Sequence, residues 1–236
     1  MSIKASGICK SFTQPDGSPK QALKDISFEI MKGELVVIGG ENGSGKSLLM
    51  KILAGLETPS EGKVDRDSEI GLVFQDADAQ ILADTAIEDV LFGLRMKDRA
   101  TARAKALAAL EKVGLDAKAD SPSHFLSGGE KRRLAIASIL ALGRDTLIFD
   151  EPYSNLDYPG VKSVNSIVTE LKEAGLTIII LTHELEKCLG LADRFMVLHH
   201  GQLVYNGDPA TALAMDLEAW GIRKPESPLE TLVWRS

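Results

Sequence analysis

The sequence has few aromatic residues, two cysteines and no long apolar run, and each shortage narrows the class of protein. Aromatic residues make up 5% of the 236 residues, so the core implied by the 44% apolar content is mainly aliphatic. No apolar run approaches the roughly eighteen residues that span a bilayer, and no apolar signal segment opens the chain. We therefore expect a soluble protein with one large domain, or a core that carries a subdomain.

Clusters of basic residues and metal-binding cysteine motifs are also absent from the sequence. The net charge is −7 and no block of lysine or arginine stands out, so nucleic acid is not expected as the main partner. Cys9 and Cys188 are too far apart in sequence to form a metal-binding motif. They are expected to be reduced, structural thiols of a cytosolic protein.

The most informative stretch that is present is the segment 40–47, GENGSGKS, between the apolar run 35–38 and the apolar-rich run 48–56. It matches G-x-x-x-x-G-K-[ST], the phosphate-binding P-loop, and its flanks predict a strand, a glycine loop and a helix. The glycines let backbone N–H groups turn toward phosphate oxygens, and the helix directs its positive end at the same anion. Lys46 can reach the β- and γ-phosphates, and the Ser47 hydroxyl can hold Mg²⁺.

The rest of the chain alternates between apolar strands and helical patterns. Apolar–polar alternation predicts a half-buried strand over 22–30, after a loop over 13–20. Further expected elements are strands over 70–74, 146–149, 177–181, 194–199 and 202–205, and helices over 86–94, 99–113, 126–142, 161–174, 184–191 and 208–215. Buried strands that alternate with helices imply a mostly parallel sheet. Residues 76–142 are predicted to be a helical insertion, and the tail from residue 216 shows little pattern.

Acidic and polar side chains follow the buried strands. Asp150 ends the strand 146–149, and the C-terminal ends of parallel strands line the crevice where a P-loop also lies. Asp150 is predicted to hold Mg²⁺, directly or through water, and Glu151 to polarise the attacking water beside the γ-phosphate. An exposed Asp-Glu-Pro turn is the alternative, and the four preceding apolar residues favour the site.

Two more strand ends carry polar side chains. His183 ends the strand 177–181 and is predicted to contact the γ-phosphate, whereas Gln75 could reach the metal or the lytic water. The other histidines, His124, His199 and His200, have no such context and are expected to be surface or turn residues.

The segment 126–130, LSGGE, opens a helix with Ser127 as a good N-cap and two glycines that permit close approach. By itself it is a second anion-binding helix start. A single site does not need two of them, so this one is expected to serve a different nucleotide.

These motifs, in this order, resemble those of the ATP-binding-cassette (ABC) ATPases, over about residues 2–210. Segment 40–47 resembles the Walker A loop, Gln75 the Q-loop, 126–130 the signature, 146–151 Walker B with its catalytic glutamate, 154–157 the D-loop and His183 the switch histidine. The resemblance implies an ATPase with ATP and Mg²⁺ as cofactors. It implies that subunits dimerise head to tail, so that each ATP lies between the P-loop of one subunit and the signature of the other.

The resemblance also assigns roles to individual residues. The catalytic residues would be Glu151, His183 and Gln75, and the metal contacts Ser47, Gln75 and Asp150. The ATP contacts would be Phe12, Asn42, Gly43, Ser44, Gly45, Lys46, Ser47 and Leu48, and the contacts to the partner's nucleotide Ser127, Gly128, Gly129 and Glu130, with Asp157 in the D-loop. Phe12 falls where the family has an adenine-stacking aromatic residue, and a core phenylalanine is the alternative.

The fold expected from the resemblance is α/β, a P-loop NTPase core with a mostly parallel sheet, an N-terminal antiparallel β subdomain and an inserted α-helical subdomain. Residues 1–236 would form a single ABC ATPase domain. Within it, residues 1–75 and 143–215 would form the nucleotide-binding core with the β subdomain, residues 76–142 the helical subdomain with the signature, and residues 216–236 a short tail.

The region after the Q-loop glutamine indicates the branch of the family. It resembles the energy-coupling-factor (ECF) transporter ATPases, which import vitamins and transition-metal ions and usually carry FQ-x-P-D-x-Q-[LI]-F and then T-[VI]-x-x-[DE]-V-x-F-G. Residues 85–93 match closely, as do Asp78 and Gln80, whereas Ala77 replaces the proline and Leu82 the phenylalanine. The implied partners are a second ABC ATPase subunit, identical or paralogous, a transmembrane coupling protein and a substrate-binding membrane subunit. The implied location is the cytoplasmic face of the membrane, with coupling helices seated near residues 75–80.

Other features depart from the family or leave alternatives open. Glu130 stands where glutamine is commoner, Tyr153 where a small residue is usual, and the short segment 63–69 suggests a trimmed hairpin. The alternatives are the ATPase of another ABC importer and a soluble ABC ATPase of DNA repair or of an assembly scaffold. Repair members insert a long coiled coil between Q-loop and signature, but here only residues 76–126 separate Gln75 from Ser127. In this family a separate membrane protein recognises the cargo.

Overall fold

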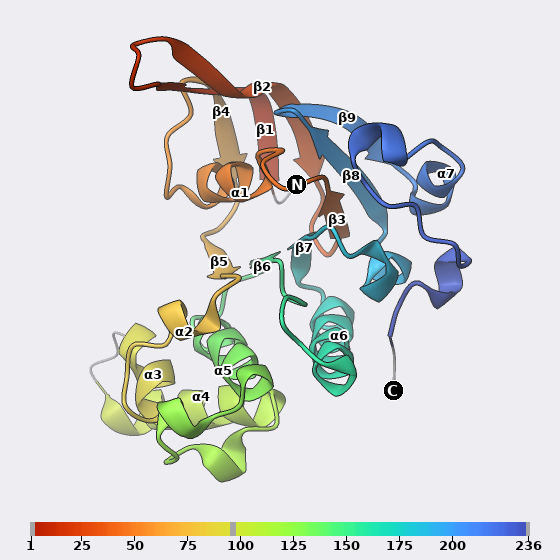
Figure 1. The fold of residues 1–236 in the computed structure, drawn as a ribbon. Coiled ribbons are helices and arrows are strands. Elements are labelled where there is room, and N and C mark those ends of the chain that lie inside the picture. Colours follow the sequence, from red (N-terminus) through yellow and green to blue (C-terminus); the bar gives the residue numbers. More distant parts are fainter. Residues whose placement is uncertain (1–2, 95–97, 235–236) are drawn as a thin grey trace.

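The computed structural model describes residues 3–94 and 98–234, which fold around two β-sheets (Figure 1). The smaller sheet has the strand order β2-β1-β4, and its pairs are antiparallel. Its strands are β1 (Ile3–Thr13), β2 (Pro19–Ile30) and β4 (Glu61–Arg66). The predicted N-terminal antiparallel sheet is therefore confirmed. The short segment after residue 60 contributes one strand, β4, which pairs with β1.

The larger sheet has the order β5-β6-β7-β3-β8-β9, and only β9 runs antiparallel to its neighbour. Its strands are β5 (Ile70–Val73), β6 (Thr146–Asp150), β7 (Thr177–Leu181), β3 (Leu35–Gly39), β8 (Arg194–His199) and β9 (Gln202–Gly207). Leu181 pairs with Ile38 on one side and with Asp150 on the other, so three strands end at the same edge. The predicted mostly parallel sheet is confirmed, and this edge is where the site forms.

Both faces of the larger sheet are covered, which explains why its strands are apolar throughout. In β3 successive side chains alternate between two cores: Leu35 and Val37 face one, and Val36 and Ile38 face the other. The second core also contains residues of β1 and β2 and of helix α1 (Lys46–Ala54), and the first contains residues of helix α6 (Tyr158–Glu173).

The helices between β5 and β6 gather into one group beside the core (Figure 1). They are α2 (Ala77–Gln80), α3 (Ala86–Gly93), α4 (Arg99–Lys112) and α5 (Gly128–Leu140). Polar side chains fix where they begin: Thr85 caps α3, Asp98 caps α4 and Ser127 caps α5. This group agrees with the predicted helical insertion, whereas the boundaries at residues 75 and 142 stay predictions.

The segment after β7 and the C-terminal tail differ from expectation. The helix predicted over 184–191 is replaced by two 3₁₀ turns, Leu185–Lys187 and Leu189–Leu191. The tail accounts for the interruption, because the N–H of Gly190 donates to the carbonyl of Leu232, and a Cβ at Gly190 would lie 2.6 Å from another tail carbonyl.

The tail is also more ordered than its sequence pattern suggests. After helix α7 (Pro209–Leu213), the side chains of Leu217, Ile222 and Leu232 are buried against the core. Among the residues that the structure describes, no helix is both long enough and apolar enough to cross a bilayer.

Candidate active site

The loop between β3 and α1 is shaped by glycines whose backbone angles other residues rarely adopt. Gly40 has φ +152° and Gly45 has φ +106°. A Cβ at Gly40 would lie 2.2 Å from the carbonyl oxygen of Leu198, and one at Gly45 would lie 2.6 Å from the Leu23 side chain. The tight loop therefore depends on glycine at both positions.

A cavity of about 710 Å³ opens in front of this loop and collects most of the predicted site residues. The P-loop residues that line it are Asn42, Gly43, Gly45, Lys46, Ser47 and Leu48. Gln75, Glu151 and His183 line the same cavity, so residues from four separate segments meet there. Ser44 is buried behind the lining, where its carbonyl accepts from the N–H of Gly201.

The Lys46 ammonium is held inside the loop that it follows. Its Nζ donates to the carbonyl of Gly40 at 2.7 Å and to that of Glu41 at 3.1 Å, and it lies 3.9 Å from Glu151 Oε1. Burial lowers the pKa of Lys46, and the nearby carboxylates of Glu151 and Asp150 oppose this shift. The position leaves a buried cation at the floor of the cavity, where it can meet an anion.

Glu151 is the buried carboxylate of the cavity. Its Oε1 lies 3.0 Å from His183 Nδ1, whereas its Oε2 is buried without a hydrogen-bond partner among the described residues. The backbone of Glu151 has φ +45°, a conformation that costs a residue other than glycine on the order of 1 kcal/mol. An unpaired carboxylate oxygen at a cavity wall is a suitable acceptor for a proton from water.

Two oxygen groups that could hold Mg²⁺ lie at the start of α1 and the end of β6. The Ser47 hydroxyl donates to Asp150 Oδ1 at 3.3 Å, and burial raises the pKa of the Asp150 carboxyl. A hydroxyl and a buried carboxylate are the hard oxygen donors that Mg²⁺ prefers, so these two residues fit the predicted ion. Gln75 lines the cavity, but its amide nitrogen is directed at the Ser154 hydroxyl, 3.5 Å away.

The signature segment forms the start of α5 with two reciprocal hydrogen bonds. The Ser127 hydroxyl accepts from the Glu130 N–H at 3.3 Å, and Glu130 Oε2 accepts from the Ser127 N–H at 2.9 Å. The Lys118 ammonium donates to Glu130 Oε1 at 2.6 Å. This bond, together with the Ser127 N–H, lowers the pKa of Glu130 to about 2. The glutamate that departs from the family pattern therefore caps the helix and carries an ion pair.

The signature lies on a second cavity of about 510 Å³, away from the P-loop. Ser127, Gly128, Gly129 and Glu130 line it together with Asp157, which caps α6 by accepting from the Gly160 N–H. Among the described residues, the two cavities have no lining residue in common. One chain thus keeps the P-loop and the signature apart.

Phe12, like Ser44, is a predicted ATP contact that does not line the cavity. It lies on β1 opposite Lys20, its side chain is 45% exposed, and it is not among the lining residues. Lys20 does line the cavity, so Phe12 is beside its rim. Exposure excludes the alternative of a core phenylalanine, and adenine stacking stays a prediction.

Arg132 is a residue of this region that the sequence motifs did not single out. It is buried, and its guanidinium donates to the carbonyls of Phe74 and Gln75, both at 2.5 Å. The helix that begins at the signature is thereby fixed to the backbone of the Q-loop. Arg132 lies in the charged run 130–133, so its residue type did not set it apart in the sequence.

Tyr153, the other departure from the family pattern, is fully buried. Its hydroxyl donates to Asn165 Oδ1 at 2.8 Å, and Asn165 Nδ2 donates to the carbonyls of Lys187 and Trp234. The large side chain therefore joins the segment after Glu151 to α6 and the C-terminal tail.

A P-loop on a parallel sheet, with buried carboxylates at the neighbouring strand end, defines a P-loop nucleoside triphosphatase. Residues 23–154 match the ABC transporter family model. The chain belongs to this ABC transporter family and is its ATP-binding and ATP-hydrolysing subunit, an ATPase.

Three comparisons describe what the chain is similar to. It is 40% identical to the energy-coupling factor transporter ATP-binding protein EcfA2 of Methanospirillum hungatei, over 86% of this chain and 55% of that protein. It therefore spans only about half the length of that relative. The structure of cbiO1 from Clostridium perfringens, part of the ABC transporter complex cbiONQ, matches with a TM-score of 0.80 and 33% identity, over 90% of each chain. The cassette MJ0796, in a dimeric post-hydrolysis state with ADP and Pi, matches with a TM-score of 0.79 and 28% identity, over 88% of this chain and 98% of that one.

Proposed function

We propose that two copies of this chain, or this chain and a paralogue, close on two ATP molecules and drive an ECF-type importer of a vitamin or a transition-metal ion. The observation that supports the proposed dimer is the separation of the P-loop cavity from the signature cavity. A second subunit placed head to tail would bring one cavity against the other. The ECF branch is supported by the names of relatives such as EcfA2 of Methanospirillum hungatei.

In each site the residues of one chain would bind and polarise the reactants. Lys46 and the backbone N–H groups of the loop hold the phosphates, and Glu151 Oε2 accepts the proton of the attacking water. His183 holds the other carboxylate oxygen in place, at 3.0 Å, and can contact the γ-phosphate. Ser47, Asp150 and Gln75 would hold Mg²⁺, which neutralises phosphate charge when bound.

The signature would complete the site of the partner subunit. Apart from adjacent residues and the backbone of α5 itself, no described heavy atom lies within 4 Å of a Cβ added at Gly128 or Gly129, so this surface is open to close approach by a phosphate. Ser127 and Glu130 line the second cavity with the two glycines, at the start of α5, where helix N–H groups can meet an anion. Asp157 lines the same cavity and would lie at the interface between subunits.

The membrane partner would dock beside the Q-loop. A smaller cavity of about 230 Å³ is lined by Asp78, Ile81, Leu82, Lys131 and neighbouring residues. Leu82, which lines this cavity, is 67% exposed, and Phe125, which packs on the lining residue His124, is 76% exposed. Both leave apolar surface for a coupling helix. Because Arg132 fixes α5 to the Q-loop backbone, closure at the signature would move this surface. The chain would then work at the cytoplasmic face of the membrane.

The test is purification of the tagged chain from detergent-solubilised membranes of its own cells, followed by identification of what remains bound. We expect a transmembrane coupling protein and a substrate-binding membrane subunit. A conventional permease would assign the chain to another class of ABC importer. A stable soluble complex without any membrane subunit would overturn the transport function and favour a scaffold role.

A further inference from the structure

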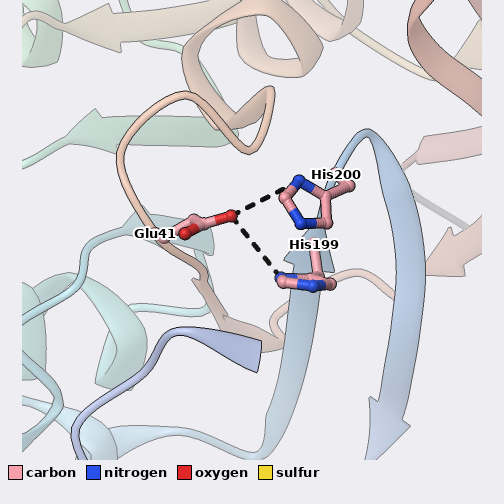
Figure 2. A group of neighbouring side chains, drawn as sticks. All are labelled: Glu41, His199 and His200. Carbon is pink, nitrogen blue, oxygen red and sulfur yellow. Dashed lines mark ion pairs between the residues drawn. The ribbon is translucent and has the colours of Figure 1, made fainter. Parts of the chain in front are cut away.

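Three potential metal ligands converge where the P-loop meets the turn after β8 (Figure 2). Glu41 comes from the P-loop, and His199 and His200 come from the end of β8 and the turn that follows it. One ligand atom of each residue lies within 4.8 Å of the other two. The two segments are already joined by the hydrogen bond from the Gly201 N–H to the Ser44 carbonyl, at 3.0 Å.

The backbone places both histidines on the same side, although neighbouring residues of a strand normally point to opposite faces. The strand ends at His199, and His200 adopts a left-handed conformation with φ +47°. The two rings consequently lie 4.0 Å apart, and each presents Nδ1 to the Glu41 carboxylate (Figure 2). Such a conformation costs a residue other than glycine on the order of 1 kcal/mol, so the turn holds His200 there against its preference.

The distances are too long for hydrogen bonds but suit a shared ion. Glu41 Oε1 lies 3.6 Å from His199 Nδ1 and 3.5 Å from His200 Nδ1. Two ligands bound tetrahedrally at the usual zinc distances are separated by about 3.4 Å. His199 Nδ1 is also buried without a hydrogen-bond partner among the described residues. A buried ring nitrogen normally has a partner, and a metal ion would supply one.

We propose that Glu41, His199 and His200 bind one divalent transition-metal ion of the Zn²⁺ or Co²⁺ type. Two imidazoles and one carboxylate form a nitrogen and oxygen set that suits these ions rather than Mg²⁺. The remaining position would be open to water, because the His200 side chain is 72% exposed. This site is separate from the Ser47 and Asp150 pair.

The site would connect to nucleotide binding through its neighbours. The Glu41 carbonyl accepts a hydrogen bond from Lys46, and His200 lines the P-loop cavity. A bound ion would cross-link the P-loop to the turn between β8 and β9. The proposal does not depend on the transport function, because the ion can be measured on the chain without nucleotide.

The experiment is calorimetric titration of the untagged, chelator-treated chain with Zn²⁺, together with visible absorption of the Co²⁺ complex. We expect one ion per chain and Co²⁺ bands typical of nitrogen and oxygen ligands, without a thiolate charge-transfer band. His199→Gln and His200→Gln should each weaken binding by at least about a hundredfold, the upper end of what loss of an outer-shell partner costs. Circular dichroism would verify that both variants are folded.

Two variants serve as matched controls. His124→Gln removes an exposed histidine outside the cluster, and Asp150→Asn alters the predicted Mg²⁺ site, and both should bind Zn²⁺ as the unaltered chain does. If His199→Gln and His200→Gln bind Zn²⁺ as tightly as the unaltered chain, the proposal is overturned. Loss of the ion in Asp150→Asn alone would overturn it too, because the ion would then occupy the nucleotide site.

Discussion

The contact between Arg132 and the Q-loop gives a stability prediction that can be worked out from its geometry. The guanidinium is 4% exposed, and its two short hydrogen bonds end on the carbonyls of Phe74 and Gln75. Hydrogen bonds of a charged donor contribute about 1.5–3 kcal/mol each. Arg132→Met keeps the apolar stem and removes both bonds, so the free energy of unfolding should fall by about 3–6 kcal/mol.

The assay is urea unfolding and thermal unfolding, both followed by circular dichroism, with ATPase turnover measured below the transition. At about 2–4 °C per kcal/mol for a chain of this size, the variant should lose roughly 6–24 °C in Tm. Arg132→Lys keeps the charge but not the planar pair of donors, and should lose about half as much. Arg133→Met is the matched control: Arg133 is the next residue of α5, is partly exposed, and has one short bond, to the Val113 carbonyl.

The expected order of stability is therefore the unaltered chain, Arg133→Met, Arg132→Lys and Arg132→Met. A loss below about 1 kcal/mol in Arg132→Met would refute the reasoning, since it would mean that water replaces both bonds at no cost.

Three further outcomes are expected. Glu151→Gln should bind ATP but lose at least about a hundredfold in hydrolysis, because a positioned base contributes roughly 10²–10⁴. Glu186→Gln, which alters an exposed glutamate that does not line the P-loop cavity, is the control, and near-normal turnover in Glu151→Gln would refute the assignment. Ser127→Arg should block the cavity that would complete the partner's site. When this variant is mixed in excess with the unaltered chain, ATP turnover per unaltered chain should fall, and unchanged turnover would rule out shared sites. The pKa of Glu130 is depressed from 4.5 to about 2, so its contribution to stability is present above pH 4.5 and is lost as the pH falls toward 2. The free energy of unfolding of Glu130→Gln should accordingly approach that of the unaltered chain as the pH is lowered over this window. A constant difference between the two free energies would contradict the assignment.

The residues at the strand ends could be placed from the sequence because parallel strands impose a common edge. Glu151 and His183 follow apolar runs, and the P-loop follows another, so their meeting in one cavity required only the sheet type. Asp150 ends the same strand edge and is joined to the P-loop by the Ser47 hydroxyl. Ser127 was predictable as a cap because its hydroxyl acts within one turn of helix.

Contacts between segments that are far apart in the sequence and share no regular residue pattern could not be predicted. The bonds from Arg132 to the Q-loop depend on how α5 packs against β5, and the burial of Tyr153 depends on where the tail passes. His199 and His200 were expected to be surface or turn residues, and His200 is exposed in a turn. The left-handed backbone that brings His200 beside His199 has no signature in the residue types. Phe12 lies on β1, and the residue pattern does not determine its distance from the cavity lining.

In the proposed dimer, the separation of the P-loop cavity from the signature cavity makes the rate of ATP hydrolysis depend on the concentration of the chain. If each cavity is half of a shared site, turnover per chain should fall on dilution, once the dimer dissociates. A membrane protein with two binding sites for the chain would remove this dependence on concentration, because it would hold the second chain at an effective concentration in the millimolar range. The chain would then hydrolyse ATP slowly when free and rapidly when bound to the membrane protein, and no inhibitor would be required.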